Sequence, residues 1–365
     1  MKFRNKYILF QIISWIIAYN LFVLIFEVGV NRWAIDNIVR ENISIWQQML
    51  IFSVVAVIIG MLLGLIDSFV NKKEFSNHSL FYLFSLKFFL YFISITVIFI
   101  ILVIYSINMN YNRMQIDAIE QNLKTAIIRI YVVFFIYSMV VSLLINFINE
   151  MKKKFGPGYL LPLFLGKYSK PVVEERIFLF IDLKSSTTYA EELGHIKYSL
   201  LIQDCFYELN KIIYDYEAEI YQYVGDEAVI TWKSTVGLKK LNAILFFFRF
   251  DHLIRERKDY FKYNYGLLPE FKAGLNMGTV TATEVGNIKR EIAYHGDAIN
   301  TAARIQSLCN QYNTHFLTSE NILNRIELPD NFEKIFIGPV TLKGKSIPVK
   351  LYSIREKDEN EFHHK

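Results

Sequence analysis

Residues 177–187 read Ile177-Phe-Leu-Phe-Ile-Asp182-Leu-Lys-Ser-Ser-Thr187. Five consecutive apolar residues bounded by polar ones predict a short strand that is buried on both faces. The three hydroxyl residues that follow are N-cap candidates for a helix, and Glu191 is suitably placed as a capping-box partner. We therefore expect Asp182 at the point where a core strand ends and a helix begins.

A second carboxylate, Asp226, lies in Tyr221-Gln-Tyr-Val-Gly225-Asp226-Glu227. Residues 219–224 and 228–232 flank this segment, and two strand-like runs around a Gly-bearing turn predict a β-hairpin. A hairpin adjacent to the strand of Asp182 would bring the two carboxylates near each other. Taken singly, Asp182 could instead be a helix cap and Asp226 an ordinary turn residue.

The chain after residue 171, where hydropathy falls, alternates between strand and helix patterns. One helix is predicted to run to Leu193, and others cover residues 195–216, 236–258 and 298–309. Strands are predicted at residues 271–277 and 279–285 around Gly278, and at 316–318, 333–342 and 349–354. This order indicates an α+β sandwich, with one sheet and helices on a face.

A third motif is Tyr294-His-Gly296-Asp-Ala-Ile-Asn300-Thr-Ala-Ala-Arg304. Asn300 and Arg304 are four residues apart, so they share one face of the predicted helix. A guanidinium stays charged and can fork onto phosphate oxygens, which suits Arg304 to a phosphate site. The alternative is a solvated arginine on an amphipathic helix.

The first 150 residues have a different composition. Hydrophobic residues make up 53% of the chain, the mean hydropathy is +0.25, and four apolar runs cover about residues 8–28, 50–70, 80–107 and 127–148. Each run is long enough to cross a bilayer, which takes roughly 20 helical residues. Ionisable residues such as Asp67 and Lys87 lie within the runs or near their ends, where side chains can snorkel, so we expect a structural role for them and not a transport path. The sequence thus predicts an all-α transmembrane bundle of four spans.

Flanking charges predict the orientation of these spans. Lysines and arginines precede the first run, Lys72 and Lys73 lie in the second loop, and residues 152–154 are three lysines after the fourth run. By the positive-inside rule, both termini and the soluble domain are cytoplasmic, in a multi-pass protein of the inner cell membrane. Residues 159–168 then form an apolar segment too short to span. It could lie on the lipid headgroups or act as a coupling element between two copies of the soluble domain.

Two function classes find little support. The net charge of +5 is modest and clusters beside apolar runs, so we expect no nucleic-acid partner. The spacing of Cys205 and Cys309 fits no disulfide or metal framework.

From about residue 174 to 354, the three motifs resemble the class III nucleotidyl cyclases, the adenylate and guanylate cyclases. Their order and domain-sized spacing carry this resemblance, which covers about half of the chain. It implies a ferredoxin-like α+β catalytic domain that converts a nucleoside triphosphate to its 3′,5′-cyclic monophosphate and pyrophosphate, for intracellular signalling. The predicted organisation is a transmembrane domain (1–150), a linker or coupling segment (151–173), the catalytic domain (174–356) and a tail (357–365).

The resemblance also assigns roles to residues. Asp182, Asp226 and the carbonyl of Leu183 would hold two divalent cations, Mg²⁺ or Mn²⁺, which prefer hard oxygen ligands. Asn300 would orient the ribose, and Arg304 would stabilise charge on the pentacoordinate phosphorus. Loop and helix N–H groups are expected to offer hydrogen bonds to phosphate. The remaining predicted nucleotide-binding residues are Ser185, Ser186, Thr187, Gln222, Ala293 and Lys345.

The same resemblance predicts a head-to-tail homodimer with sites at the subunit interface, each taking metals from one subunit and Asn300 and Arg304 from the other. ATP is the expected substrate because it is the common one in the family. Gln222 and Ala293 occupy the base-reading positions, where adenylate cyclases typically have Lys and Asp or Thr, and guanylate cyclases Glu and Cys. A carboxamide both donates and accepts hydrogen bonds, so Gln222 suits adenine, guanine or a pyrimidine.

Two other functions stay open. Gly225-Asp226-Glu227 echoes the turn signature of diguanylate cyclases, although the expected double glycine is absent and Ala228 replaces a phenylalanine. The unusual base-reading positions are also compatible with a membrane receptor whose cyclase-like domain binds nucleotide with weak or no catalysis.

Overall fold

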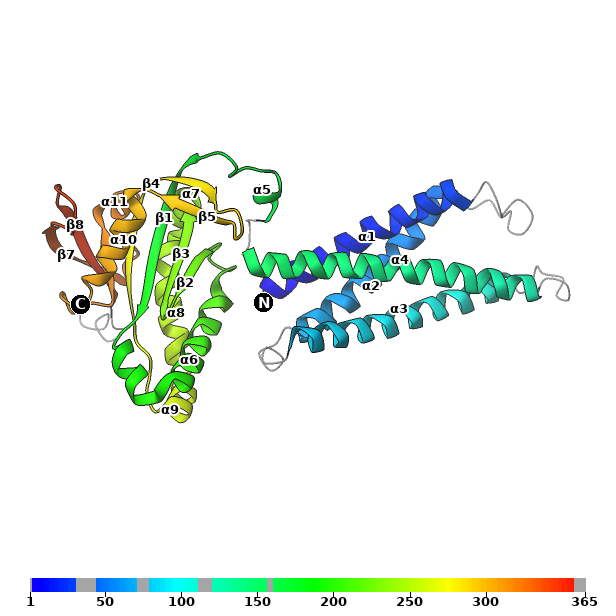
Figure 1. Ribbon diagram of the computed structural model, residues 1–365, viewed down its shortest axis with the longest axis horizontal. Coiled ribbons are helices and arrows are strands. Elements are labelled where there is room, and N and C mark those ends of the chain that lie inside the picture. The colour runs from blue at the N-terminus through cyan, green and yellow to red at the C-terminus, as the bar shows by residue number, and fades with distance from the viewer. Residues whose placement is uncertain (1, 31–43, 71–78, 111–119, 156–159, 358–365) are drawn as a thin grey trace. The chain divides into compact units, whose positions relative to one another are not determined.

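In the computed structural model, the described residues are 2–30, 44–70, 79–110, 120–155 and 160–357. The chain divides into two compact units, Met1–Met151 and Lys152–Lys365 (Figure 1). The finer boundaries at residues 173 and 356 stay predictions.

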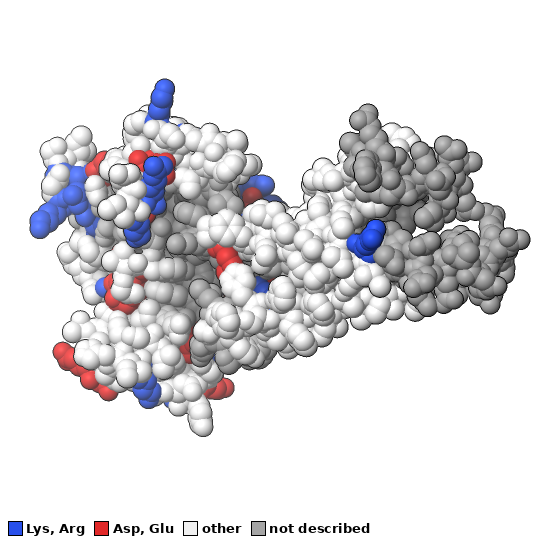
Figure 2. All heavy atoms as spheres, turned by 45° about the vertical axis from the view of Figure 1, so that its right-hand side comes forward, with Lys and Arg blue, Asp and Glu red and all other residues white. Residues whose placement is uncertain are grey.

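The first unit consists of long helices: α1 (Lys2–Val30), α2 (Ile45–Val70), α3 (Leu80–Asn110) and α4 (Glu120–Phe155). Within the described residues, four segments are long and apolar enough to cross a membrane, as predicted: Ile8–Phe26, Ile45–Val70, Phe81–Ile101 and Tyr131–Lys152. Gly60 and Gly64 of α2 lie directly against Ile12 and Ile8 of α1, and small residues of this kind allow two helix backbones to approach closely. On the face drawn in Figure 2, charged side chains gather on the second unit, and the described surface of the helical unit carries few.

Asp67 and Lys87 pair with each other inside the helical unit and do not snorkel to its ends. Asp67 is fully buried, and its carboxylate lies 3.2 Å from the Lys87 ammonium, which is itself 7% exposed. Gln11 of α1 donates a hydrogen bond of 2.6 Å to the same carboxylate. Because a buried charge needs partners, this cluster links α1, α2 and α3 inside the helical unit.

The second unit contains α5 (Leu160–Phe164) and, within the described residues, an eight-stranded mixed sheet. The strands run in the order β2-β3-β1-β4-β6-β8-β7, with β5 paired to β4. The central order β4-β1-β3-β2 with its intervening helices is ferredoxin-like, as expected (Figure 1). The strands are β1 (Val172–Leu183), β2 (Glu219–Val224), β3 (Glu227–Lys233), β4 (Phe271–Val285), β5 (Glu291–His295), β6 (Phe316–Ser319), β7 (Phe332–Val340) and β8 (Val349–Glu356); the helices are α6 (Ser186–Ile212), α7 (Ser234–Leu238), α8 (Asn242–Glu256), α9 (Lys258–Tyr265), α10 (Asp297–Ser307) and α11 (Glu320–Leu323).

Alternation along β1 separates two cores. Ile177, Leu179 and Ile181 point into the large core formed with α6 and α8. Phe178 and Phe180 point to the opposite face, where α10 packs. Side chains alternate strictly along a strand, so Asp182 lies on the α10 face together with the phenylalanines.

Several predicted boundaries are wrong. The strands around Gly278 are one continuous strand, β4, because the glycine serves as a packing contact: a Cβ there would lie 3.0 Å from Ala298 of α10. β5 was not predicted.

The predicted helix at residues 236–258 is broken into α7, a 3-10 turn at Lys239–Leu241 and α8. Ser185 is the N-cap of α6, but it has φ of 59° and no side-chain capping bond. The predicted break near residue 194 is confirmed by the non-helical Gly194 within α6.

Candidate active site

Asp182 lies at the centre of the first candidate group of residues. It is the penultimate residue of β1, and its neighbours in register are Glu227 on β3 and Lys272 on β4. The carboxylate accepts a hydrogen bond of 2.9 Å from the Gln306 side chain of α10 and lies 3.2 Å from the Lys272 ammonium. Burial raises the pKa of Asp182, Lys272 opposes this change, and the charge of Asp226 adds to it. The group therefore favours an additional cation.

Asp226 follows Gly225, whose φ of 62° makes the tight β2–β3 turn possible. The Oδ2 atom of Asp226 is buried and has no hydrogen-bond partner within the described part of the chain. An orphaned carboxylate oxygen next to Asp182 suits a divalent cation, which would satisfy it. No group of three or more His, Cys, Asp or Glu side chains among the described residues is placed as a complete metal site. Two carboxylates fit Mg²⁺ or Mn²⁺ when phosphate and water supply the remaining ligands.

Three members of this group were not singled out from the sequence: Glu227, Lys272 and Gln306. Burial, followed by the charges of Asp182 and Asp226, raises the pKa of Glu227 to about 7. Glu227 could have been identified from the sequence, because it directly follows Asp226. Lys272 and Gln306 carried no local signal, because the β1–β4 register and the docking of α10 bring them to Asp182.

Asn300, Arg304 and Lys345 form a second candidate group. Lys345, in the β7–β8 loop, pairs at 2.7 Å with Asp297 in the first turn of α10. The Arg304 guanidinium lies against Gly344, 3.5 Å from where a Cβ would stand. Asn300 is exposed, and its amide is 3.4 Å from the Gly296 carbonyl. Asp297 and Arg304 are seven residues apart on α10, so the structure brings the predicted arginine and lysine to one face of this helix.

The two groups occupy different faces of α10. Gln306 is buried against the sheet and contacts Asp182, whereas Asn300 is exposed and Arg304 is half-buried. At 3.6 residues per turn, Arg304 projects about 160° away from Gln306. A single chain therefore directs its arginine away from its own pair of aspartates.

The other predicted residues lie on β2, on β5 and between the end of β1 and the first turn of α6. Gln222 is exposed on β2, and Ala293 is half-buried on β5. Their neighbours Tyr221 and Tyr294 are in ring contact, with centroids 5.1 Å apart. Ser185 is exposed before α6, Ser186 and Thr187 form its first turn, and the side chain of Leu183 is in the core. None of these six residues contacts Arg304 in the interactions of the described part of the chain.

An acidic group suited to cations and a basic group suited to phosphate, on one ferredoxin-like sheet, define a candidate nucleotidyl-transfer site. Residues 170–356, just over half of the chain, match the family described as the adenylate and guanylate cyclase catalytic domain. The chain belongs to this family.

Individual relatives agree with this assignment. The chain is 33% identical over 219 residues to "Adenylate cyclase 2" of Rhizobium meliloti (strain 1021), which covers 60% of each protein. It is 25% identical over 187 residues to "Adenylate cyclase" of Anabaena cylindrica, covering 48% of this chain and 36% of the relative. Among solved structures, a bacterial light-regulated adenylyl cyclase superposes with a TM-score of 0.51 at 19% identity, covering 62% of this chain and 68% of that one.

Proposed function

We propose that this protein is a membrane-anchored nucleotidyl cyclase that converts ATP to 3′,5′-cyclic AMP and pyrophosphate. The orphaned Asp226 oxygen beside Asp182, on a sheet of the cyclase family, is the observation that carries the proposal. Asp182 and Asp226 would hold Mg²⁺ or Mn²⁺, together with the carbonyl of Leu183. When bound, the cations would lower the pKa of the ribose 3′-hydroxyl and neutralise the triphosphate.

The chain's own residues would do the rest. Asn300 would orient the ribose so that its 3′-oxygen lies in line with the α-phosphorus, and positioning of this kind can lower the barrier greatly. As the new O–P bond forms and the bond to pyrophosphate breaks, Arg304 would stabilise the charge that develops on the phosphoryl oxygens. Lys345 would bind the triphosphate, since it follows Gly344, which lies against the Arg304 guanidinium. The N-terminus of α6, with Ser185, Ser186 and Thr187, would offer N–H groups to phosphate.

The opposite orientation of Arg304 and Gln306 on α10 supports a homodimer with two shared sites. Asp182 and Asp226 of one copy would face Asn300 and Arg304 of the other. A C₂ arrangement forms two identical sites from one interface.

The four apolar helices support a membrane location. With Lys72, Lys73 and the three lysines at 152–154 on the cytoplasmic side, both termini and the catalytic domain would face the cytoplasm. Reporter fusions at both ends of the chain would test this topology, and an external reporter at either end would contradict it.

A panel of the four ribonucleoside triphosphates with Mn²⁺, offered to the full-length chain in membranes, tests the activity. We expect cyclic AMP from the unaltered chain and from Arg325→Ala, an exposed arginine outside both groups. Arg304→Ala should form it about 10²–10³-fold more slowly. A different cyclic monophosphate would reassign the base. Absence of any cyclic product would support the alternative, a cyclase-like nucleotide-binding receptor, for which Gln222 and Ala293 are the motivating positions.

A further inference from the structure

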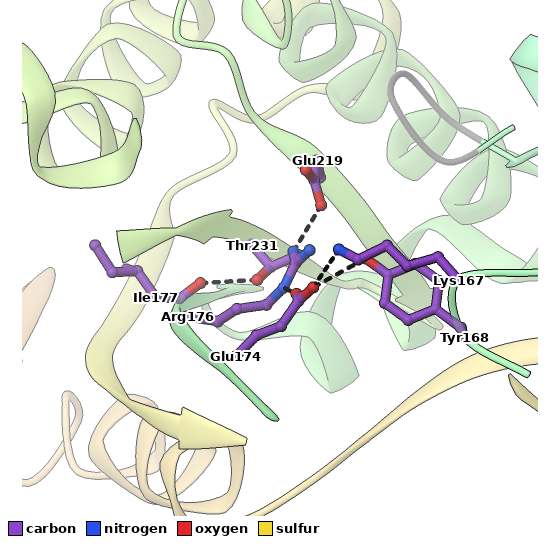
Figure 3. A network of polar contacts seen from close by, with 7 residues as sticks. All are labelled: Lys167, Tyr168, Glu174, Arg176, Ile177, Glu219 and Thr231. Carbon is purple, nitrogen blue, oxygen red and sulfur yellow. Dashed lines mark hydrogen bonds and ion pairs between the residues drawn. The ribbon is translucent and has the colours of Figure 1, made fainter. Parts of the chain in front are cut away.

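A network of polar side chains joins the segment before β1 to strands β1 and β2, and it includes no residue of either candidate group. Figure 3 shows Lys167, Tyr168, Glu174, Arg176 and Glu219 in this network. At its centre is Arg176 of β1, which is 1% exposed. Its guanidinium donates hydrogen bonds to Glu174 at 2.9 Å and to Glu219 of β2 at 2.6 Å. Lys167 and Tyr168, which precede β1, donate to the other oxygen of Glu174 at 2.6 and 3.3 Å.

The network has matched charges. Lys167 and Arg176 balance Glu174 and Glu219. Burial by itself would raise the pKa of Glu174, but hydrogen bonds from Lys167 and Arg176 outweigh it and leave this pKa below its ordinary value. An arginine so deeply buried is costly unless its donors are paired, and its planar fork allows it to bond two carboxylates at once.

Two partners of Arg176, Glu219 and Tyr294, belong to the two strands that carry the base-reading positions. Glu219 is on β2, three residues before Gln222. The guanidinium also lies 4.7 Å from the ring centre of Tyr294, the residue after Ala293 on β5. β2 and β5 do not pair with each other, because β3, β1 and β4 lie between them in the sheet. Arg176 therefore connects two strands that the hydrogen bonding of the sheet keeps apart.

A bulge in β2 extends this connection. The β2–β3 register shifts between Ile220 and Gln222, at Tyr221. Bulges re-aim side chains, and the Tyr221 ring here meets the Tyr294 ring at 5.1 Å. Arg176 lies over the Tyr294 ring, and Tyr294 meets Tyr221 edge to face, so the three side chains form a continuous row of contacts between the backbone segments that present Ala293 and Gln222.

We propose that Arg176 is a positioning residue for base selection, which fixes the spacing between Gln222 and Ala293 through Glu219 and Tyr294. The inference rests on the proposed function, because it takes these two residues to face the base. Neither Arg176 nor Glu219 would touch the nucleotide. Their loss would change which base is accepted, in addition to any loss of rate.

The test compares ATP and GTP as substrates of the full-length chain in membranes with Mn²⁺, for Arg176→Lys and Glu219→Gln. The matched control is Glu175→Gln, which removes an ion pair to Arg325 from the other face of the same strand. The quantity compared is kcat/KM for ATP divided by kcat/KM for GTP. If one of the two nucleotides is not turned over, its inhibition constant against the other is measured in place of its kcat/KM. We expect the ATP-to-GTP ratio to change by about fivefold or more in both network variants, since small displacements at a site have large kinetic effects, and to stay constant in the control.

Glu219→Gln keeps the test decisive if Arg176→Lys fails to fold, because Glu219 is at the rim of the network and 22% exposed. A folded Glu219→Gln variant whose ratio matches that of the unaltered chain would overturn the inference, as would an equal change in Glu175→Gln. If the ATP-to-GTP ratio of Glu219→Gln is unchanged while the control is fully active, base positioning by Arg176 is refuted and the proposed function is not. No cyclic product from the unaltered chain would instead refute the proposed function and this inference with it.

Discussion

Co-expression of Asp182→Ala with Arg304→Ala tests whether each site is shared between two copies of the chain. On α10, Gln306 contacts the aspartate of its own chain, and Arg304 projects about 160° away from it. An arginine in this orientation can serve the aspartate pair of a second copy, but not that of its own chain. Each single variant should therefore be inactive by itself, with a loss of about 10²–10³-fold for the arginine by analogy with lost charge-stabilising donors.

The recovered activity in the mixture follows from the symmetry. If the two chains associate at random in equal amounts, half of the dimers are mixed. Each mixed dimer has one site with both defects and one intact site. The expected activity is therefore about one quarter of that of the unaltered dimer, well above the sum of the single variants.

The assay measures cyclic AMP formed by differently tagged full-length chains, after purification through both tags in sequence. That step isolates mixed dimers, for which about half of the unaltered activity is expected because one of two sites is intact. Asp182→Ala mixed with Asp226→Ala is the matched control: both substitutions lie in the acidic group, so neither site of the mixed dimer is intact and no recovery is expected. Mixed dimers of Asp182→Ala and Arg304→Ala that form but stay inactive would refute the shared site.

Three further predictions concern stability. Because burial and neighbouring carboxylates raise the pKa of Glu227 to about 7, the cation-free native state binds this proton more tightly than the unfolded state does. The contribution of Glu227 to the free energy of unfolding is then full below about pH 4.5 and declines as pH rises to 7. The melting temperature measured with a chelator present should show this decline. The Glu227→Gln variant should lack the decline, and added Mn²⁺ should oppose it. Lys87→Met should destabilise the helical unit by about 3 kcal/mol, because the Asp67 carboxylate stays buried without the Lys87 ammonium. Adding Asp67→Asn should restore the melting temperature in detergent. A melting temperature unchanged by Lys87→Met would contradict this prediction. Gly274→Ala would place a Cβ 2.2 Å from the Gln306 backbone nitrogen, so we expect a loss of about 2–3 kcal/mol in the catalytic unit, and an unaltered melting temperature would show that α10 is not packed as described.

Local sequence patterns were sufficient for the elements that carry the acidic group. The apolar run before Asp182 and the Gly225 turn before Asp226 predict a strand end and a hairpin, and both are found. These patterns are short-range, since strand burial and a positive φ at glycine each leave a mark within a few residues. The four apolar helices were predictable for the same reason.

Gly278 shows where local patterns mislead. From the sequence it interrupts two strands, but in the fold it is the point where α10 approaches β4. The same chemical feature, a missing Cβ, serves a turn in one case and a close contact in the other, and only the packing partner distinguishes them. Ser185 is a similar case, because a suitable hydroxyl at a helix start makes no capping bond when its backbone is left-handed.

The sequence by itself determined the two-part organisation, the α+β character of the second unit, and the identity of Asp182, Asp226, Asn300 and Arg304 as candidate residues, since each depends on neighbours along the chain. The ferredoxin-like order was implied by the family resemblance. The tertiary structure decided that Lys272 and Gln306 meet Asp182, and that Arg304 faces away from it. It also decided that Arg176 joins β2 to β5. The physical reason is that strand register and helix docking bring together side chains separated by tens of residues, and no local periodicity records those contacts.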